Sequence, residues 1–168
     1  GFETLILRPA TVCGYAPRLR LDLSVNIMAN HAVNNRVIRV FGGAQVRPNI
    51  HIEDMADLYL RTVTFSTEKI DGKIYNAGYY NLTISEIAQT ARTVVGSDVR
   101  IDVEPTNDYR SYRINSDLIR SELGFAATRD VATAVRDLRD AFDRGLVPNP
   151  MTDPRYYNIK TMQLVGLK

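Results

Sequence analysis

Arg47 and Arg110 carry guanidinium groups, whose chemistry suits an anionic ligand such as a diphosphate. A guanidinium presents a planar fork of N–H donors, and its charge-assisted bonds to phosphate oxygens are strong. A helix that starts at Asp22 adds a second feature, because unpaired amides at a helix N-terminus attract anions. The Asp22 carboxylate opposes that attraction, and Arg18 or Arg20 could offset its charge. These residues predict recognition of a diphosphate.

The same side chains also have structural interpretations, which stay open at this point. Arg47 could form an ion pair with Glu53 or Asp54, and Arg110 could lie in a solvated charged loop. We expect His51 to pack in the core or to cap the following helix rather than to act as a base. No carboxylate in the sequence is obviously placed to orient it.

The elements that position these residues alternate between strands and helices. The apolar run at 4–7, closed by Arg8 and Pro9, predicts a strand buried on both faces, as in a parallel sheet. Ligands in such sheets bind just beyond the carboxyl ends of the strands. Further strands are predicted over 37–41, 73–77 and 99–103. Helices are predicted over 22–35, 52–65, from a capping box at Thr83 to Gly96, from Ser116 to Gly124, and from Asp130 to Gly145.

The composition indicates one ordinary domain and excludes several classes of partner. The chain has 168 residues and a net charge of +2, too small to indicate a nucleic-acid or membrane partner. Its single cysteine, Cys13, excludes an intramolecular disulfide and suits a reducing compartment, so we expect a cytoplasmic protein. His31 and His51 have no cluster of ligands around them, and no metal site is predicted.

Five segments, in this order and spacing, resemble the extended short-chain dehydrogenase/reductase family, the NAD-dependent nucleotide-sugar epimerases and dehydratases. The segments are LRPATVCG at 7–14, VFGG at 40–43, QVRPNIHIEDMA at 45–56, YNAG at 75–78 and ELGF at 122–125. The resemblance departs at Cys13, where the family usually has tyrosine. It implies an α/β fold made of the last strands of a Rossmann-type parallel sheet and a small α/β substrate-binding lobe. Residues 1–148 would then be the C-terminal, substrate-binding portion of such an enzyme, and 149–168 a C-terminal tail.

The resemblance also implies roles for single residues. It places the loop Ala10, Thr11 and Val12 against the nicotinamide ring of the cofactor, with Thr11 also near the sugar. It implies that Asp22 and Leu23 meet the diphosphate and that Arg39 and Phe41 flank the base. It implies further that Arg47 and Arg110 bind the diphosphate from opposite sides, with Arg113 in reserve.

The sequence lacks the two motifs with which this family binds NAD and catalyses its reaction. There is no GxxGxxG turn, and the one Tyr-xxx-Lys match, Tyr156 with Lys160, lies in a proline-flanked segment near the C-terminus. We therefore expect no catalytic residue in this chain and no activity of the chain alone. NAD or NADP would serve the complete enzyme, without tight binding to this chain.

The expected partners are a nucleotide sugar, a missing N-terminal Rossmann portion and a second copy of the chain. The resemblance leaves open whether the reaction is epimerisation, dehydration or reduction, and which sugar and base are used. An alternative also stays open, namely a non-catalytic module that binds a nucleotide or a protein.

Overall fold

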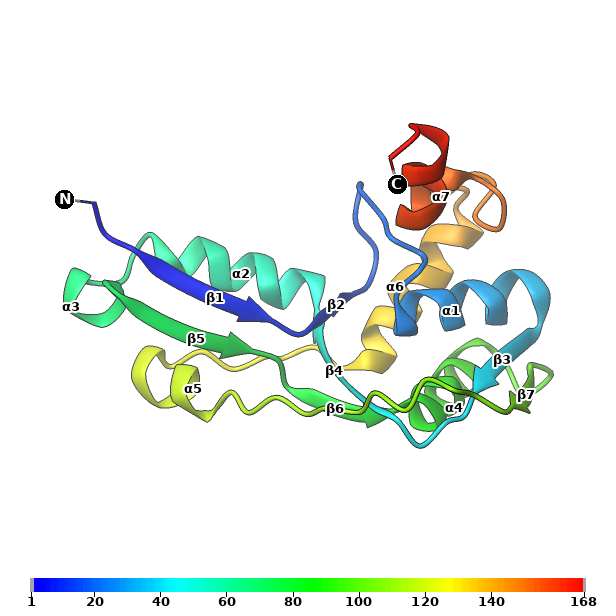
Figure 1. The fold of residues 1–168 in the computed structure, drawn as a ribbon, viewed down its shortest axis with the longest axis horizontal. Helices are drawn as coiled ribbons and strands as arrows, with labels where there is room; N and C mark the ends of the chain where they lie inside the picture. Colours follow the sequence, from blue (N-terminus) through cyan, green and yellow to red (C-terminus); the bar gives the residue numbers. More distant parts are fainter. Residues whose placement is uncertain (1, 168) are drawn as a thin grey trace.

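The computed structural model describes residues 2–167, which form three small sheets and the helices around them (Figure 1). The sheets contain β1 (Leu5–Pro9) with β5 (Lys73–Ala77), β2 (Thr11–Cys13) with β4 (Val46–His51) and β6 (Tyr80–Thr83), and β3 (Val37–Phe41) with β7 (Arg100–Glu104). The helices are α1 (Ser24–Asn35), α2 (Ile52–Thr62), α3 (Thr67–Ile70), α4 (Ile84–Val95), α5 (Asp117–Leu123), α6 (Val131–Asp143), the 3-10 helix η1 (Pro154–Tyr156) and α7 (Asn158–Leu164). The molecule is elongated, with β1 and β5 towards one end and β3 and β7 towards the other.

Strands β1 and β5 run parallel in register from Leu5 opposite Lys73 to Pro9 opposite Ala77, as predicted for two parallel strands. The prediction that the first strand is buried on both faces is wrong. Ile6 is 52% exposed and its register partner Ile74 is 43% exposed. Helices α2 and α5 and their flanking residues contribute to the apolar cluster on this sheet, and no described element covers these two side chains. Self-association through this surface stays a prediction.

The three-stranded sheet was not predicted. Its middle strand β4 pairs parallel with β2 and antiparallel with β6. The sequence obscured it because β2 has only three residues and begins directly after Pro9 and Ala10, while β4 contains Pro48, which cannot donate a ladder hydrogen bond. This sheet lies between the two ends of the molecule and carries Arg47 (Figure 1).

Two apolar clusters form the core. The larger one lies where α1, α4 and α6 pack on one another and on β3, around side chains such as Val25, Ile38 and Leu138. The other gathers Ile50, Tyr75 and further residues beneath β1 and β5. The helices predicted over 22–35, from Thr83 to Gly96 and from Asp130 to Gly145 are confirmed, and each is stabilised mainly by the apolar face that it buries.

Of the side-chain caps predicted for α4, α5 and α6, two are present. The Thr83–Glu86 capping box is present at the start of α4, and Asp130 accepts a bond from Thr133 N at the start of α6. Ser116 does not cap α5, which corrects the third prediction. Its hydroxyl instead accepts a bond from Gly78 N at 2.9 Å and donates to Gly78 O at 2.7 Å.

Gly78 lies where two segments approach closely. A Cβ at this position would lie 2.5 Å from the Ala10 Cβ and 2.7 Å from a methyl of Ile114. Glycine is therefore the residue that allows β5 to pass the β1–β2 junction on one side and the segment before α5 on the other.

The C-terminal segment is bonded to the start of α1 and to the loop before it. Leu21 N donates to Tyr156 O at 2.8 Å, and Asn158 N donates to the Asp22 carboxylate at 3.0 Å. The Asn30 amide donates to Pro150 O at 3.1 Å. The segment 150–158 therefore contacts α1 and the loop before it. The division of the chain into a portion over 1–148 and a tail over 149–168 stays a prediction.

Candidate functional site

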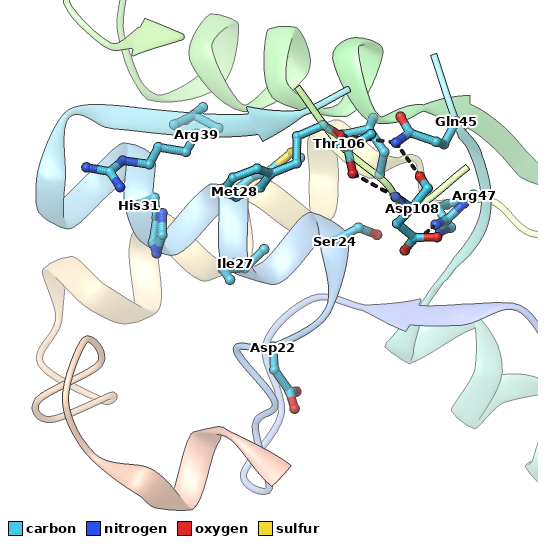
Figure 2. A pocket seen from close by; sticks show the side chains of 13 residues that line it. Asp22, Ser24, Ile27, Met28, His31, Arg39, Gln45, Arg47, Thr106 and Asp108 are labelled. Carbon is cyan, nitrogen blue, oxygen red and sulfur yellow. Dashed lines mark hydrogen bonds and ion pairs between the residues drawn. The ribbon is translucent and has the colours of Figure 1, made fainter. Parts of the chain in front are cut away.

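A pocket of about 700 Å³ opens between α1, β3 and the segments that follow β3 and β7 (Figure 2). Four of the predicted ligand-binding residues line it, namely Asp22, Arg39, Phe41 and Arg47. The other lining residues were not predicted as ligand contacts: Ser24, Ile27, Met28, His31, Ile38, Gln45, Ile84, Thr106 and Asp108. Tertiary structure therefore brings together four of the seven residues predicted to bind the substrate and adds nine others.

Helix α1 presents one face to the pocket. Ser24, Ile27, Met28 and His31 follow the spacing i, i+3, i+4, i+7, which places them on one side of a helix. The Ser24 hydroxyl oxygen is buried and has no hydrogen-bond partner. No side chain caps α1, and no acidic residue lies in its first turn. The start of α1 is therefore a polar site that offers a hydroxyl and helix-terminal amides to an anion.

Arg47 lies in the wall of the pocket with its side chain 17% exposed. Its guanidinium donates to the carbonyl oxygens of Val46 and Arg110, and its Nη2 is 3.8 Å from the Asp108 carboxylate. It also lies over the Tyr112 ring, 5.6 Å from the centroid. An ion pair of Arg47 with Glu53 or Asp54, the structural alternative, is wrong, because both of those carboxylates pair with Arg129.

Arg110 and Arg47 share one carboxylate, that of Asp108. Arg110 Nε and Nη2 donate to Asp108 at 2.8 and 2.7 Å, and the Arg110 side chain is 82% exposed. Hydrogen bonds from Arg110 hold the pKa of Asp108 well below its usual range, so this carboxylate is an anion. The Asp108 carboxylate thus lies beside the Arg47 guanidinium (Figure 2) and also pairs with Arg110.

Asp22 lines the edge of the main pocket, and Leu23 lies outside it. The Asp22 carboxylate bonds to Arg20 and to Asn158 N. Burial raises the pKa of Asp22, but the hydrogen bonds from Arg20 and Asn158 together lower the pKa by more, so the net shift is downward. Asp22 therefore lines the edge of the pocket, but its carboxylate is already bonded to Arg20 and Asn158. Leu23 does not line this pocket but a smaller one of about 130 Å³ beside it.

Arg39 and Phe41 lie on the outer face of β3, where strand alternation directs them to the pocket. Arg39 Nε is 3.9 Å from a Glu104 carboxylate oxygen. His31 of α1 lines the same region and was missed as a ligand contact, although its helical spacing from Ser24 would have placed it there. Burial, together with the nearby charge of Arg39, lowers the pKa of His31.

Ala10, Thr11 and Val12 do not line the main pocket. Ala10 N donates to Ala77 O at 2.8 Å, and Thr11 and Val12 pair with Asn49 and Ile50 of β4. These three residues therefore lie at the carboxyl end of β1, as predicted, and their contact with a nicotinamide ring stays a prediction. Beside Thr11, Asn49 is fully buried and its Oδ1 has no partner.

His51 caps α2, as expected. Its Nδ1 accepts a bond from Glu53 N at 3.2 Å, and its Nε2 is 3.1 Å from Asp137 Oδ2. The expectation that no carboxylate orients His51 is wrong, because Asp137 comes from the distant helix α6. Near it, burial raises the pKa of the Cys13 thiol to about 12, so this thiol is protonated at neutral pH.

Residues 2–167 contain neither a metal-binding cluster nor a membrane-spanning helix. No group of three or more His, Cys, Asp or Glu side chains there could hold a metal ion. Within the same residues, no helix has the length and apolar character needed to cross a membrane.

Comparison with known proteins shows which family part of this chain matches and which solved structures share its fold. Residues 1–78 match the NAD dependent epimerase/dehydratase family. The fold is shared with solved enzymes of low sequence identity. One is a UDP-glucose 4-epimerase from Thermotoga maritima with UDP-glucose, with a TM-score of 0.71 and 18% identity over 86% of this chain and 47% of that one. Another is a dTDP-glucose 4,6-dehydratase from Bacillus anthracis in complex with NAD, with a TM-score of 0.70 and 17% identity over 87% of this chain and 47% of that one.

A third similar structure is a UDP-glucuronic acid 4-epimerase from Bacillus cereus in complex with UDP-glucuronic acid and NAD. Its TM-score is 0.70 at 18% identity, over 83% of this chain and 45% of that one. The chain therefore spans about half the length of the solved structures that it matches. It has an α/β fold with parallel strands, and its family likeness lies in residues 1–78.

The extent of the family match corrects the expectation for the chain as a whole. We expected residues 1–148 to be the C-terminal, substrate-binding half of an epimerase or dehydratase. The family match instead covers residues 1–78, which contain the Rossmann-like pair β1 and β5, and leaves out the later segments assigned to the substrate lobe. The interpretation as a C-terminal, substrate-binding half is therefore contradicted. Short motifs predicted the family, but their order alone does not determine which part of a longer fold a chain represents.

Proposed function

We propose that the main pocket binds the nucleoside diphosphate part of a nucleotide sugar, in a protein related to the NAD dependent epimerases and dehydratases. The observation that carries the proposal is the charged end of the pocket. There, the guanidinium of Arg47 and the unpartnered Ser24 hydroxyl at the start of α1 line one cavity of about 700 Å³. A diphosphate satisfies both, because it accepts bonds from a guanidinium fork, a hydroxyl and helix-terminal amides.

Arg110 supports the same ligand from the exposed side. It already holds one carboxylate together with Arg47, at 2.7 Å from its Nη2 and 3.8 Å from that of Arg47. A phosphate that replaces the Asp108 carboxylate keeps both charges compensated. The exposed position of Arg110 lets its side chain move onto the ligand.

The described pocket is not proposed as the site of the dinucleotide cofactor. The chain has no GxxGxxG turn, and α1 begins after Leu21, Asp22 and Leu23 rather than after glycines. A Gly-rich turn is the feature that lets the pyrophosphate of NAD approach the backbone closely at the start of a helix. We propose that the chain alone binds neither NAD nor NADP tightly, and that Ala10, Thr11 and Val12 meet the nicotinamide ring only when the rest of a cofactor site is present.

Isothermal titration calorimetry of this chain with uridine diphosphate or thymidine diphosphate tests the proposal. Arg47→Ala should weaken binding by about tenfold to a hundredfold, the worth of a charge-assisted contact. Arg47→Lys should restore only part of it, because an ammonium cannot reproduce the fork. Arg100→Ala is the control, since Arg100 is exposed on β7 and pairs only with Asp102 among its described contacts.

Two results would contradict the proposal. Arg47→Ala could lower only the melting temperature and leave nucleotide affinity intact, which would make Arg47 a structural residue of the loop that carries Asp108. Micromolar binding of NADH by the chain would contradict the expected absence of a cofactor site. Repeating the wild-type titration at higher salt checks that binding is electrostatic, because interactions between exposed charges weaken as ionic strength rises.

A further inference from the structure

The side chain of Gln45 joins the turn after β3 to the segment that carries Asp108, at the end of the pocket that holds Arg47 (Figure 2). Its Oε1 accepts a hydrogen bond from Gly43 N at 2.7 Å. Its Nε2 donates to Phe41 O at 3.2 Å and to Asp108 O at 2.9 Å. Gln45 is 9% exposed, and all three partners are backbone groups, so they fix the orientation of the amide.

Gly42 leaves the space that this amide occupies. A Cβ at Gly42 would lie 2.5 Å from Gln45 Nε2, 2.9 Å from Gln45 Oε1 and 2.5 Å from a methyl of Thr106. The φ angle of Gly42 is +78°, in the region that favours glycine. The glycine therefore allows the turn after β3, the Gln45 amide and the segment before Asp108 to pack closely together.

Arg110 lies between two points at which its segment is bonded to the residues around the start of β4. Before Arg110, Asp108 O is bonded to the Gln45 amide. After it, the Ser111 hydroxyl accepts a bond from Val46 N at 3.0 Å. Loss of the Gln45 amide would free the backbone that leads into Arg110, while the bond at Ser111 would remain. An arginine on a freer backbone loses more conformational entropy when it is fixed on a ligand.

We propose that Gln45 is a positioning residue of the diphosphate site, which holds Arg110 at a fixed distance from Arg47 through the backbone of Asp108. Arg47 lies on β4, two residues after Gln45, and the Gln45 amide holds the backbone two residues before Arg110. This fixed spacing lets both guanidinium groups meet one ligand at a smaller cost in chain entropy. The inference rests on the proposed function, because it needs a diphosphate bound at Arg47.

A double-mutant cycle, measured by calorimetric titration of the full chain with inorganic pyrophosphate, tests this role. In the wild-type background, Arg110→Ala should weaken binding by about tenfold, the lower end of the worth of a charge-assisted contact. Gln45→Met keeps the length of the side chain but not its amide, and alone it should weaken binding to a similar extent. In the Gln45→Met background, Arg110→Ala should change the affinity by less than about twofold, because Arg110 is no longer held in place. Arg47→Ala should weaken binding by about tenfold or more in both backgrounds.

Two further variants make the test specific. Gln45→Asn keeps the amide on a side chain that is one methylene shorter, so it should retain part of the Arg110 effect, and it replaces Gln45→Met if that variant does not fold. Gln89→Met is the matched control, because Gln89 is exposed on α4 and does not line this pocket. It should leave the pyrophosphate affinity and the Arg110 effect unchanged.

The outcomes separate this inference from the proposed function. Gln45→Met that only lowers the melting temperature, with an Arg110 effect equal to that in the wild type, would make Gln45 a structural residue and overturn the positioning role. An Arg110→Ala variant that binds as tightly as the wild type would overturn it too, because there would be no contact to position. In both cases, Arg47-dependent pyrophosphate binding still supports the diphosphate site. Pyrophosphate binding that does not depend on Arg47, or no binding at all, overturns both.

Discussion

We predict that removing the Asp54 carboxylate lowers the free energy of unfolding more, per atom removed, than removing any other side chain. It lies in the first turn of α2, is 2% exposed and accepts four hydrogen bonds. Its Oδ2 accepts from the backbone N–H groups of Thr128 and Arg129 at 3.1 and 2.9 Å. Its Oδ1 accepts from the Thr128 hydroxyl at 3.0 Å and from Arg129 Nη1 at 2.7 Å. Asp54 thereby ties α2 to the segment that leads into α6.

Replacing Asp54 with alanine leaves these donors without an acceptor. Removal of one partner from a buried ion pair costs about 3–5 kcal/mol, a large part of the roughly 5–15 kcal/mol by which a domain is stable. For a chain of this length the melting temperature should fall by about 6–20 °C. Differential scanning calorimetry measures this shift directly. Asp54→Asn should recover part of the stability, since its amide oxygen still accepts hydrogen bonds.

Asp57→Ala is the matched control for this experiment. Asp57 contacts the same Arg129 at 3.2 Å, but its side chain is 47% exposed. Exposed ion pairs contribute below about 1 kcal/mol, so its melting temperature should change little. Equal shifts for Asp54→Ala and Asp57→Ala would refute the reasoning, because burial would then not determine the cost.

Two further outcomes are expected. Asp108→Asn should raise the affinity for pyrophosphate by about threefold, because the half-exposed Asp108 carboxylate forms only weak ion pairs with Arg47 and Arg110 and the ligand no longer displaces it. Calorimetry that instead shows weaker binding would make Asp108 a residue that positions the arginines. The folded pKa of Asp22 lies below its ordinary value of 3.8, so its contribution to stability is present above that pH and is lost as pH falls through the lower folded value. Urea unfolding should therefore show Asp22→Asn less stable than wild type at neutral pH, and this difference should shrink as the pH falls below 3.8. A difference that stays constant with pH would exclude the titration of Asp22 as the cause.

The local elements of this fold were largely predictable from the sequence. The capping box at Thr83 and the cap at Asp130 are short-range patterns, and α4 and α6 begin where these patterns predict. Helix α1 begins at Ser24, two residues after the predicted start at Asp22. The strands β3, β5 and β7 were predicted to within one residue at each end. Such patterns are readable because neighbouring residues along the chain determine helix faces, caps and strand alternation.

Tertiary structure alone decided which of those elements share a site. The sequence determined that Arg39, Phe41 and Arg47 were candidates, but not that Ser24 and His31 of α1 line the same pocket. It also did not reveal that Asp108 pairs with Arg47 or that Asp137 contacts His51.

The physical reason is the distance along the chain between the partners. A contact between residues far apart in sequence depends on how whole strands and helices pack, and the middle sheet that places Arg47 is built from short strands with weak patterns of their own. Only the packing of β4 between β2 and β6, with α1 and the segment after β7 beside it, brings these charges together.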